Sequence, residues 1–269
     1  IAPQLKRLVE QLGDQEFSLR ERAAEQLLQQ GMAAKPALLD GLKHPDLEIR
    51  MRSHQLLARA MQSDFERRMA AFIADVDDQQ EHDLPGWQRF RDQVGSDPKA
   101  RKLFVEMLKN EAGLLESFEN QPEQIGDVLA QRVRNLQARS FNNYRSANQV
   151  EPASIATILF LGTEDSARSN SILKSLMYSV LNQAAVKQAV REGTHAAQLR
   201  ELLESWIVRT EDPSQPYYGL MLALNYDLKD AGLDLGRRYL AQKSVSPMVL
   251  QYGAIAVGRE EPVEIYATH

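Results

Sequence analysis

The chain has 269 residues, of which 43% are hydrophobic and 26% are charged, as in ordinary folded proteins. Its net charge is −5, and the acidic excess is spread along the chain. This balance argues against a nucleic-acid groove, whose affinity comes from clustered Lys and Arg. The absence of cysteine excludes disulfides and Cys-ligated zinc, and no apolar run reaches the roughly 18 residues that a membrane span needs.

We therefore expect a soluble protein without a membrane span. It is either cytoplasmic or exported after removal of a signal peptide, because the chain begins at Ile1 rather than Met. An excised piece of a longer chain is the alternative. The oligomeric state is left open by the sequence.

Two segments near the N-terminus repeat at a shift of 30 positions, where "LGDQEFSLRERAAEQLL" from Leu12 aligns with "LKHPDLEIRMRSHQLLA" from Leu42. The matched pairs include Phe17 with Leu47, Leu19 with Ile49, Leu27 with Leu57, Arg20 with Arg50, Arg22 with Arg52, and Ala23 with Ser53. Self-similarity at a period of tens of residues predicts stacked helical units, none of which can bury its apolar face alone.

This region, residues 5–61, resembles the HEAT repeat, the paired-helix unit of α-solenoids, in its bacterial type. The matching features are Asp14 and Asp46 in the turns, Arg20 and Arg50 in the second helices, and Pro36 near the start of a first helix. The resemblance implies that both arginines are structural and pair with acids such as Asp14 or Asp46. It returns more weakly near the C-terminus. It does not imply a function, because HEAT arrays serve unrelated roles.

Apolar periodicity predicts the N-terminal helices at 3–12, 15–30, 33–43 and 46–61, followed by a separate helix at 64–75 with Asp64 as N-cap. The stretch "DVDDQQEHDLPG", residues 75–86, is acidic, aperiodic and closed by Pro-Gly. We predict a loop here, longer than the turns usual between solenoid helices.

Beyond this loop the self-similarity is lost, and a less regular helical segment is predicted. Helices are expected at 87–94, from Pro98 with Asp97 as N-cap, and at 125–141, before a polar boundary at 142–152. The most apolar stretch, 153–162, has strand-like composition, but its helical neighbours favour a buried helix. Further helices are predicted at 169–192, 195–210, 216–228, 231–242 and 246–258.

The predicted fold is all-α, a right-handed α-α superhelix of the HEAT-like solenoid type with an irregular middle. Three parts of one continuous solenoid are expected: N-terminal repeats at 1–74, a divergent helical segment at 75–150, and C-terminal repeats at 151–269.

Motifs of enzyme chemistry do not occur in the chain. The five His show no H-E-x-x-H arrangement, and no phosphate-binding glycine motif or G-x-S-x-G elbow occurs. No catalytic residue, cofactor or metal ligand is therefore assigned. The acidic loop is rich in the oxygen ligands that Ca²⁺ prefers, but Gln80 and Gly86 occupy the positions where an EF-hand loop needs Gly and Glu. A solvated turn is predicted instead.

Aromatic and arginine side chains near loops are the candidate binding residues. Trp87, Phe90 and Arg91 follow the acidic loop, and Trp and Arg are enriched at interface hot spots. The spacing of Trp87 and Phe90 equally fits the buried stripe of a helix. Tyr144 and Arg145 lie on a predicted loop, the usual location of functional residues.

The predicted function is a non-enzymatic scaffold module that binds a protein or peptide partner along a solenoid surface. One alternative is an enzyme or metal site that uses the 75–83 loop. A HEAT-like nucleic-acid binder is the weaker alternative, because the chain is acidic overall.

Overall fold

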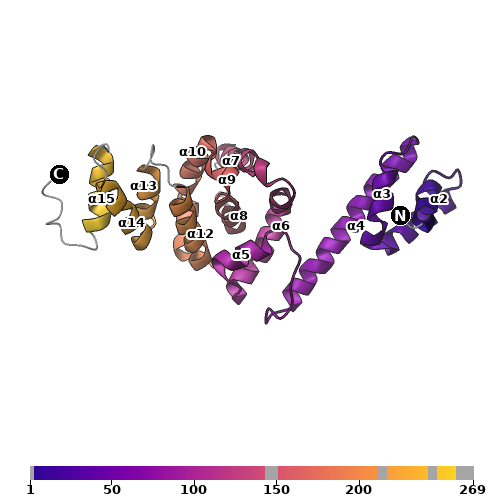
Figure 1. The fold of residues 1–269 in the computed structure, drawn as a ribbon, viewed down its shortest axis with the longest axis horizontal. Coiled ribbons are helices and arrows are strands. Elements are labelled where there is room, and N and C mark those ends of the chain that lie inside the picture. The colour runs from indigo at the N-terminus through magenta and orange to yellow at the C-terminus, as the bar shows by residue number, and fades with distance from the viewer. Residues whose placement is uncertain (1–2, 143–150, 211–216, 242–246, 259–269) are drawn as a thin grey trace. The chain divides into compact units, whose positions relative to one another are not determined.

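The computed structural model describes residues 3–142, 151–210, 217–241 and 247–258. Within these ranges the regular structure is α-helix and short 3-10 helix, with no strand, so the all-α prediction is confirmed (Figure 1). The chain divides into two compact units, Ile1–Leu84 and Pro85–His269. The boundary lies within the acidic loop, so that residues 75–84, which we had grouped with the residues after them, belong to the first unit.

The N-terminal unit contains two helix pairs. Its elements are α1 (Pro3–Gln11), α2 (Phe17–Gln29), the 3-10 helix η1 (Gly31–Ala34), α3 (Lys35–Gly41) and α4 (Leu47–Ala74). Helix α1 contacts α2 and α3 contacts α4 within the pairs, while α1 contacts α3 and α2 contacts α4 between them. The 30-residue repeat of the sequence thus corresponds to two helix pairs stacked on each other.

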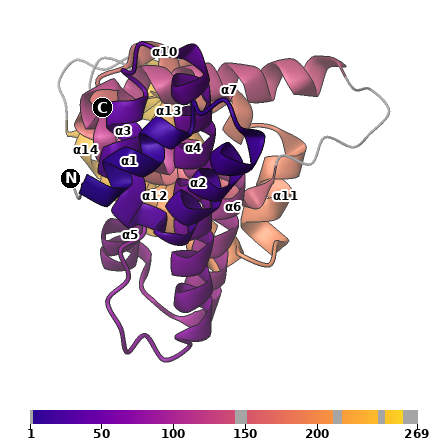
Figure 2. The same ribbon diagram turned by 90° about the vertical axis from the view of Figure 1, so that its right-hand side faces the viewer.

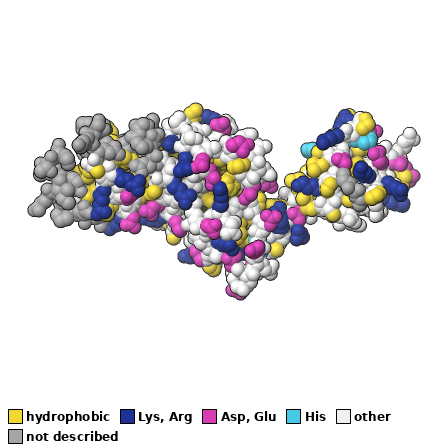
Figure 3. Space-filling model, in the orientation of Figure 1, with side chains coloured by type: hydrophobic (Ala, Val, Ile, Leu, Met, Phe, Trp, Pro, Cys, Tyr) yellow, Lys and Arg dark blue, Asp and Glu magenta, His cyan; other side chains and the backbone are white. Residues whose placement is uncertain are grey.

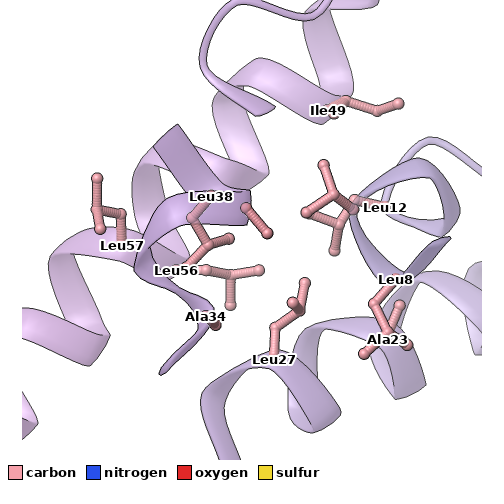
Figure 4. Close-up of a cluster of buried hydrophobic side chains, with 11 residues drawn as sticks. Leu8, Leu12, Ala23, Leu27, Ala34, Leu38, Ile49, Leu56 and Leu57 are labelled. Carbon is pink, nitrogen blue, oxygen red and sulfur yellow. The ribbon is translucent and has the colours of Figure 1, made fainter. Parts of the chain in front are cut away.

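Apolar side chains from all four helices meet between the two pairs (Figure 4). Leu12, directly after α1, Leu27 of α2 and Leu38 of α3 are fully buried at 0% exposure, and Ile49 and Leu56 of α4 close the cluster. No single pair contains this core, because each helix contributes only one apolar stripe. Both pairs must therefore stack before the core can form.

Helix α4 is continuous from Leu47 to Ala74, so the predicted break between residues 61 and 64 is wrong. Asp64 does not cap a helix. Its carboxylate instead accepts hydrogen bonds from Arg67 Nη2 at 2.6 Å and Arg68 Nε at 2.9 Å, both along the same helix. These i,i+3 and i,i+4 pairs support a continuing helix, and the sequence 61–64 contains no Gly or Pro that would end it.

The C-terminal unit is built from the remaining helices. They are α5 (Trp87–Val94), α6 (Pro98–Asn120), the 3-10 helix η2 (Pro122–Gln124), α7 (Ile125–Asn142), α8 (Pro152–Leu161), α9 (Asp165–Arg168), α10 (Ser171–Leu181), α11 (Ala184–Glu192), α12 (Ala196–Arg209), α13 (Tyr217–Asn225), α14 (Lys229–Leu240) and α15 (Pro247–Gly258). The predicted helix at 169–192 is two helices, α10 and α11, because the chain turns at residues 182–183.

Helix α8 lies at the centre of this unit, surrounded by its neighbours (Figure 1). Every residue from Ala153 to Leu161 is buried, and α8 contacts α6, α7, α11 and α12. The preference for helix over strand is therefore confirmed. A helix that is apolar on every face is stable where neighbouring helices cover all of its faces.

Contacts distant in sequence distinguish this region from an open array. Helix α5 contacts α12, so the helices around α8 close on themselves. In a solenoid, by contrast, each unit contacts only its neighbours. The C-terminal end of α7 projects beyond the helices it packs against (Figure 2).

A buried carboxylate joins three helices of this unit. Glu111 lies at a kink of α6, with φ −137° and ψ 32°, and is 6% exposed. It accepts hydrogen bonds from Arg132 Nη2 of α7 at 2.5 Å and from Ser154 Oγ of α8 at 2.6 Å. Pairing on both sides compensates the burial of its charge, which would be costly alone. We assign this network to packing of α6, α7 and α8.

Candidate functional site

The turns of the N-terminal unit are each held by an arginine. Arg20 Nη1 donates to the backbone carbonyl oxygens of Asp14 at 2.7 Å and Gln15 at 3.2 Å. Arg50 Nη1 makes the equivalent bonds to His44 at 2.7 Å and Pro45 at 2.7 Å. Each arginine thus bonds to the turn before its helix, and its partners are carbonyl oxygens rather than the expected carboxylates of Asp14 and Asp46.

The two turn aspartates, Asp14 and Asp46, do not occupy equivalent repeat positions. Asp14 Oδ1 accepts a hydrogen bond from the backbone N–H of Glu16 at 2.9 Å. The repeat equivalent of Asp14 is His44, whose Nδ1 accepts a hydrogen bond from the backbone N–H of Asp46 at 3.1 Å. Asp46 is the N-cap of α4, whose side chain accepts from the backbone N–H groups of Glu48 and Ile49. Both carboxylates are therefore used by backbone donors within their own turns.

The second helices of the two pairs are joined by Arg52. Its Nη1 donates to Glu21 of α2 at 2.9 Å and its Nε to Glu48 of α4 at 2.6 Å. The bonds to Glu48 and then Glu21 raise the pKa of the Arg52 guanidinium above its usual value. This ion network links α2 and α4, which contact each other and share one surface.

That surface carries large apolar side chains at matching repeat positions. Phe17 is the first residue of α2 and is 63% exposed, while Leu47 is the first residue of α4 and is 60% exposed. Met51 follows one turn after Leu47 and is 52% exposed. We name Phe17, Leu47 and Met51 the apolar face. Sequence alignment paired Phe17 with Leu47 but did not show that both are exposed.

The acidic loop is organised around Asp75, at the end of α4. The Asp75 carboxylate accepts from the backbone N–H groups of Gln79 and Gln80, both at 2.9 Å, and lies 2.8 Å from His82 Nε2. These bonds, that from Gln79 first and the His82 contact next, lower the pKa of the Asp75 carboxyl to about 2. The ring of His82 packs edge-on against Phe72, with ring centroids 5.1 Å apart.

The hydrogen bonds of Asp75 argue against the alternative of a cation or enzyme site in the loop. Both oxygens of Asp75 already accept N–H hydrogen bonds, so binding a cation would displace them. Asp77, Glu81 and Asp83 are exposed. Among the described residues, no group of three or more His, Asp and Glu side chains is arranged to hold a metal ion. Hydrogen bonds to Asp75 therefore hold the loop in the described structure.

The structure places the aromatic candidates in the core. Trp87 is 2% exposed and Phe90 is 0% exposed, and both rings pack on Phe104, with centroids 5.0 and 5.1 Å away. They are the buried stripe of α5, so they cannot form a binding spot at the surface. Arg91 is half-buried, and its Nη2 donates to Gln88 at 2.9 Å.

Tyr144 and Arg145, the remaining binding candidates, lie outside the described residues. Over the described surface of one face, Lys and Arg side chains are interspersed with Asp and Glu (Figure 3). None of the described helices is both long and apolar enough to cross a membrane. Comparisons with protein-family models, curated proteins and solved structures give no significant match.

Proposed function

We propose that the chain is a non-enzymatic interaction module, and that its N-terminal unit is a HEAT-like pair of repeats of a right-handed solenoid. The stacking of α1 on α3 and α2 on α4 supports this proposal, as do the equivalent arginine bonds in the two turns. In such a stack the second helices lie side by side and present one shared surface to a partner.

The observation that carries the binding proposal is the exposure of Phe17 and Leu47 at matching repeat positions. The first residue of a helix can be polar at no cost to the core, yet both repeats expose a large apolar side chain there. Packed helices are about 8–10 Å apart, so the two side chains form a row across α2 and α4. An amphipathic protein segment can cover such a row with apolar residues spaced along its own backbone.

The charges beside the apolar face suit a polar rim. Glu21 and Glu48 are about half-exposed, at 45% and 49% of their side chains, and Arg52 holds them in place. Protein interfaces combine an apolar centre with a polar, solvated rim. We therefore infer a protein or peptide partner whose apolar side chains contact Phe17, Leu47 and Met51.

The test is capture of a stoichiometric protein partner from an extract of the source cells. We expect the wild type to retain one partner and the Phe17→Ser, Leu47→Ser double variant to lose it. The matched control is Ile172→Ser on α10, which removes a comparably exposed residue, 57%, from the other unit. Circular dichroism of all three proteins checks that helicity is unchanged.

Retention of the partner by the double variant would move the binding surface elsewhere. Recovery of no protein partner by the wild type would count against the scaffold function itself. Because the exchanged side chains contribute little to the core, a loss of binding reports on the surface rather than on folding.

A further inference from the structure

A hollow of about 510 Å³ opens on the C-terminal unit, between α5, the end of α8, α9 and the end of α12. Its volume lies within the range of small-ligand sites. Phe160 forms part of its wall and is only 2% exposed, packed against Phe90 with ring centroids 5.7 Å apart. We name it the arginine hollow, because Arg89, Arg168 and Arg209 line it.

Arg209 provides a cationic group that the described protein does not use. It lies at the end of α12, is exposed, and forms no hydrogen bond or ion pair with any described residue. A guanidinium presents several N–H donors in a planar fork that matches carboxylate and phosphate oxygens. Its position at the edge of a hollow makes these donors available to a ligand.

The other two arginines are held in ion pairs that a ligand could replace or join. Arg168 pairs with Asp165, whose side chain is 91% exposed, and exposed pairs of this kind contribute little to stability. Arg89 Nη1 lies 2.6 Å from Glu164 Oε1, and its guanidinium stacks 4.9 Å above the Phe118 ring. Arg89 is thereby fixed, whereas Arg168 can exchange Asp165 for another oxyanion.

The side-chain amide of Gln93 also favours a ligand with oxygen acceptors. Gln93 of α5 lines the hollow, and its side-chain Nε2 is buried without a hydrogen-bond acceptor among the described residues. A buried donor without a partner is destabilising, and most such groups in native structures are satisfied by protein or water. A rotation of the Gln93 side chain would bring this buried donor to the hollow, where an oxygen of a bound ligand would supply the missing acceptor.

We propose that the arginine hollow binds a small molecule through a phosphate or carboxylate group. Arg209 and Arg168 are its cationic contacts, the rotated Gln93 side chain donates a hydrogen bond, and Arg89 holds Glu164 in place. Because three carboxylates, those of Asp92, Glu164 and Asp165, line the hollow together with the three arginines, the ligand that fits best carries hydroxyl or amino donors beside its anionic group.

Isothermal titration calorimetry of the whole chain with inorganic phosphate and, separately, with citrate tests this site. We expect saturable binding of at least one anion at low ionic strength, weakening as salt is added. Arg209→Ala should weaken it about tenfold, because a charge-assisted hydrogen bond is removed. Arg134→Ala, which removes an exposed arginine of α7 outside the hollow, should leave it unchanged.

Binding of phosphate alone would identify a phosphate-bearing ligand, and binding of citrate alone a carboxylate. Arg209→Lys should retain part of the affinity, and Gln93→Met should lower it without removing a charge. No saturable binding of either anion would overturn the proposal, as would equal losses in Arg209→Ala and Arg134→Ala. The exposed position of Arg209 allows its variants to fold, which circular dichroism checks.

Discussion

Ser53 illustrates how one residue can limit the stability of the N-terminal core. It is 0% exposed, and its hydroxyl has no hydrogen-bond partner among the described residues. Its repeat equivalent is Ala23, 1% exposed. We expect Ser53→Ala to raise the free energy of unfolding by about 1 kcal/mol, because a buried unsatisfied hydroxyl is removed.

Thermal or denaturant unfolding followed by circular dichroism measures this change. Ser53→Val is the matched control, because it also removes the hydroxyl but adds volume beside Gly41. A Cβ built on Gly41 would lie only 2.2 Å from Ser53 Oγ, so the Ser53 side chain already packs closely against the backbone of α3 there. Valine should therefore lower stability through overpacking. A destabilised Ser53→Ala would show that the hydroxyl is satisfied in solution.

Asp75 makes the acidic loop sensitive to pH. Its folded pKa of about 2 lies below the ordinary aspartate value of about 3.9. The ionised carboxylate therefore stabilises the folded loop above pH 4, and this contribution is lost as the pH falls toward 2. We expect the carboxyl resonance of Asp75 to titrate near pH 2 by NMR. Titration of this resonance near the ordinary aspartate value would contradict the prediction.

A matched pair of variants checks the same loop at neutral pH. Asp75→Asn weakens the bonds to the Gln79 and Gln80 amides and the contact with His82, so proteolysis within 76–81 should become faster. Asp77→Asn, which removes an equal charge from an exposed position, should leave the rate unchanged. Equal rates in both variants would show that the Asp75 contacts do not hold the loop.

At the scale of elements, close helix packing depends on glycine where α14 meets α15. A Cβ on Gly236 would lie 2.9 Å from Val257 Cγ2 and 3.0 Å from the Gly253 carbonyl oxygen. We expect Gly236→Ala to lower the free energy of unfolding by about 1–2 kcal/mol, because overpacking exceeds the gain in helix propensity.

Gly113 of α6 provides a control with the opposite expected change in stability, because a Cβ there meets nothing within 4 Å. Gly113→Ala should stabilise the protein by about 0.5–1 kcal/mol through helix propensity alone. Differential scanning calorimetry compares the two variants. Stabilisation by both would show that α14 and α15 can separate without cost.

At the scale of the whole molecule, the two units should unfold separately. The N-terminal unit has its own core of α1–α4, and the C-terminal unit is organised around buried α8. We expect Ser53→Ala to shift only the transition of the first unit and Gly236→Ala only that of the second. Hydrogen exchange measured by mass spectrometry assigns each transition, and a single transition shifted by both variants would contradict this independence.

The sequence by itself determined the helical class, the repeat and the local caps. The apolar periodicity and the turn residues predicted ends of α2 and α5 close to the observed ones. The predicted Asp97 cap before Pro98 is confirmed. These features depend on neighbours within a few residues, which the sequence displays directly. The continuation of α4 past residue 61 was missed, because its i,i+4 ion pairs outweigh a possible N-cap at Asp64.

Only the tertiary structure decided which apolar side chains are buried and which charges are paired. The sequence left Trp87 and Phe90 open between a binding spot and a buried stripe, and the structure buries both. Phe17 and Leu47, which the sequence only matched as repeat positions, are exposed. The arginine hollow joins residues of α5, α9 and α12 that lie far apart in the chain. Burial and pairing depend on contacts between distant segments, and a single sequence gives the local pattern of each segment but not which segments meet.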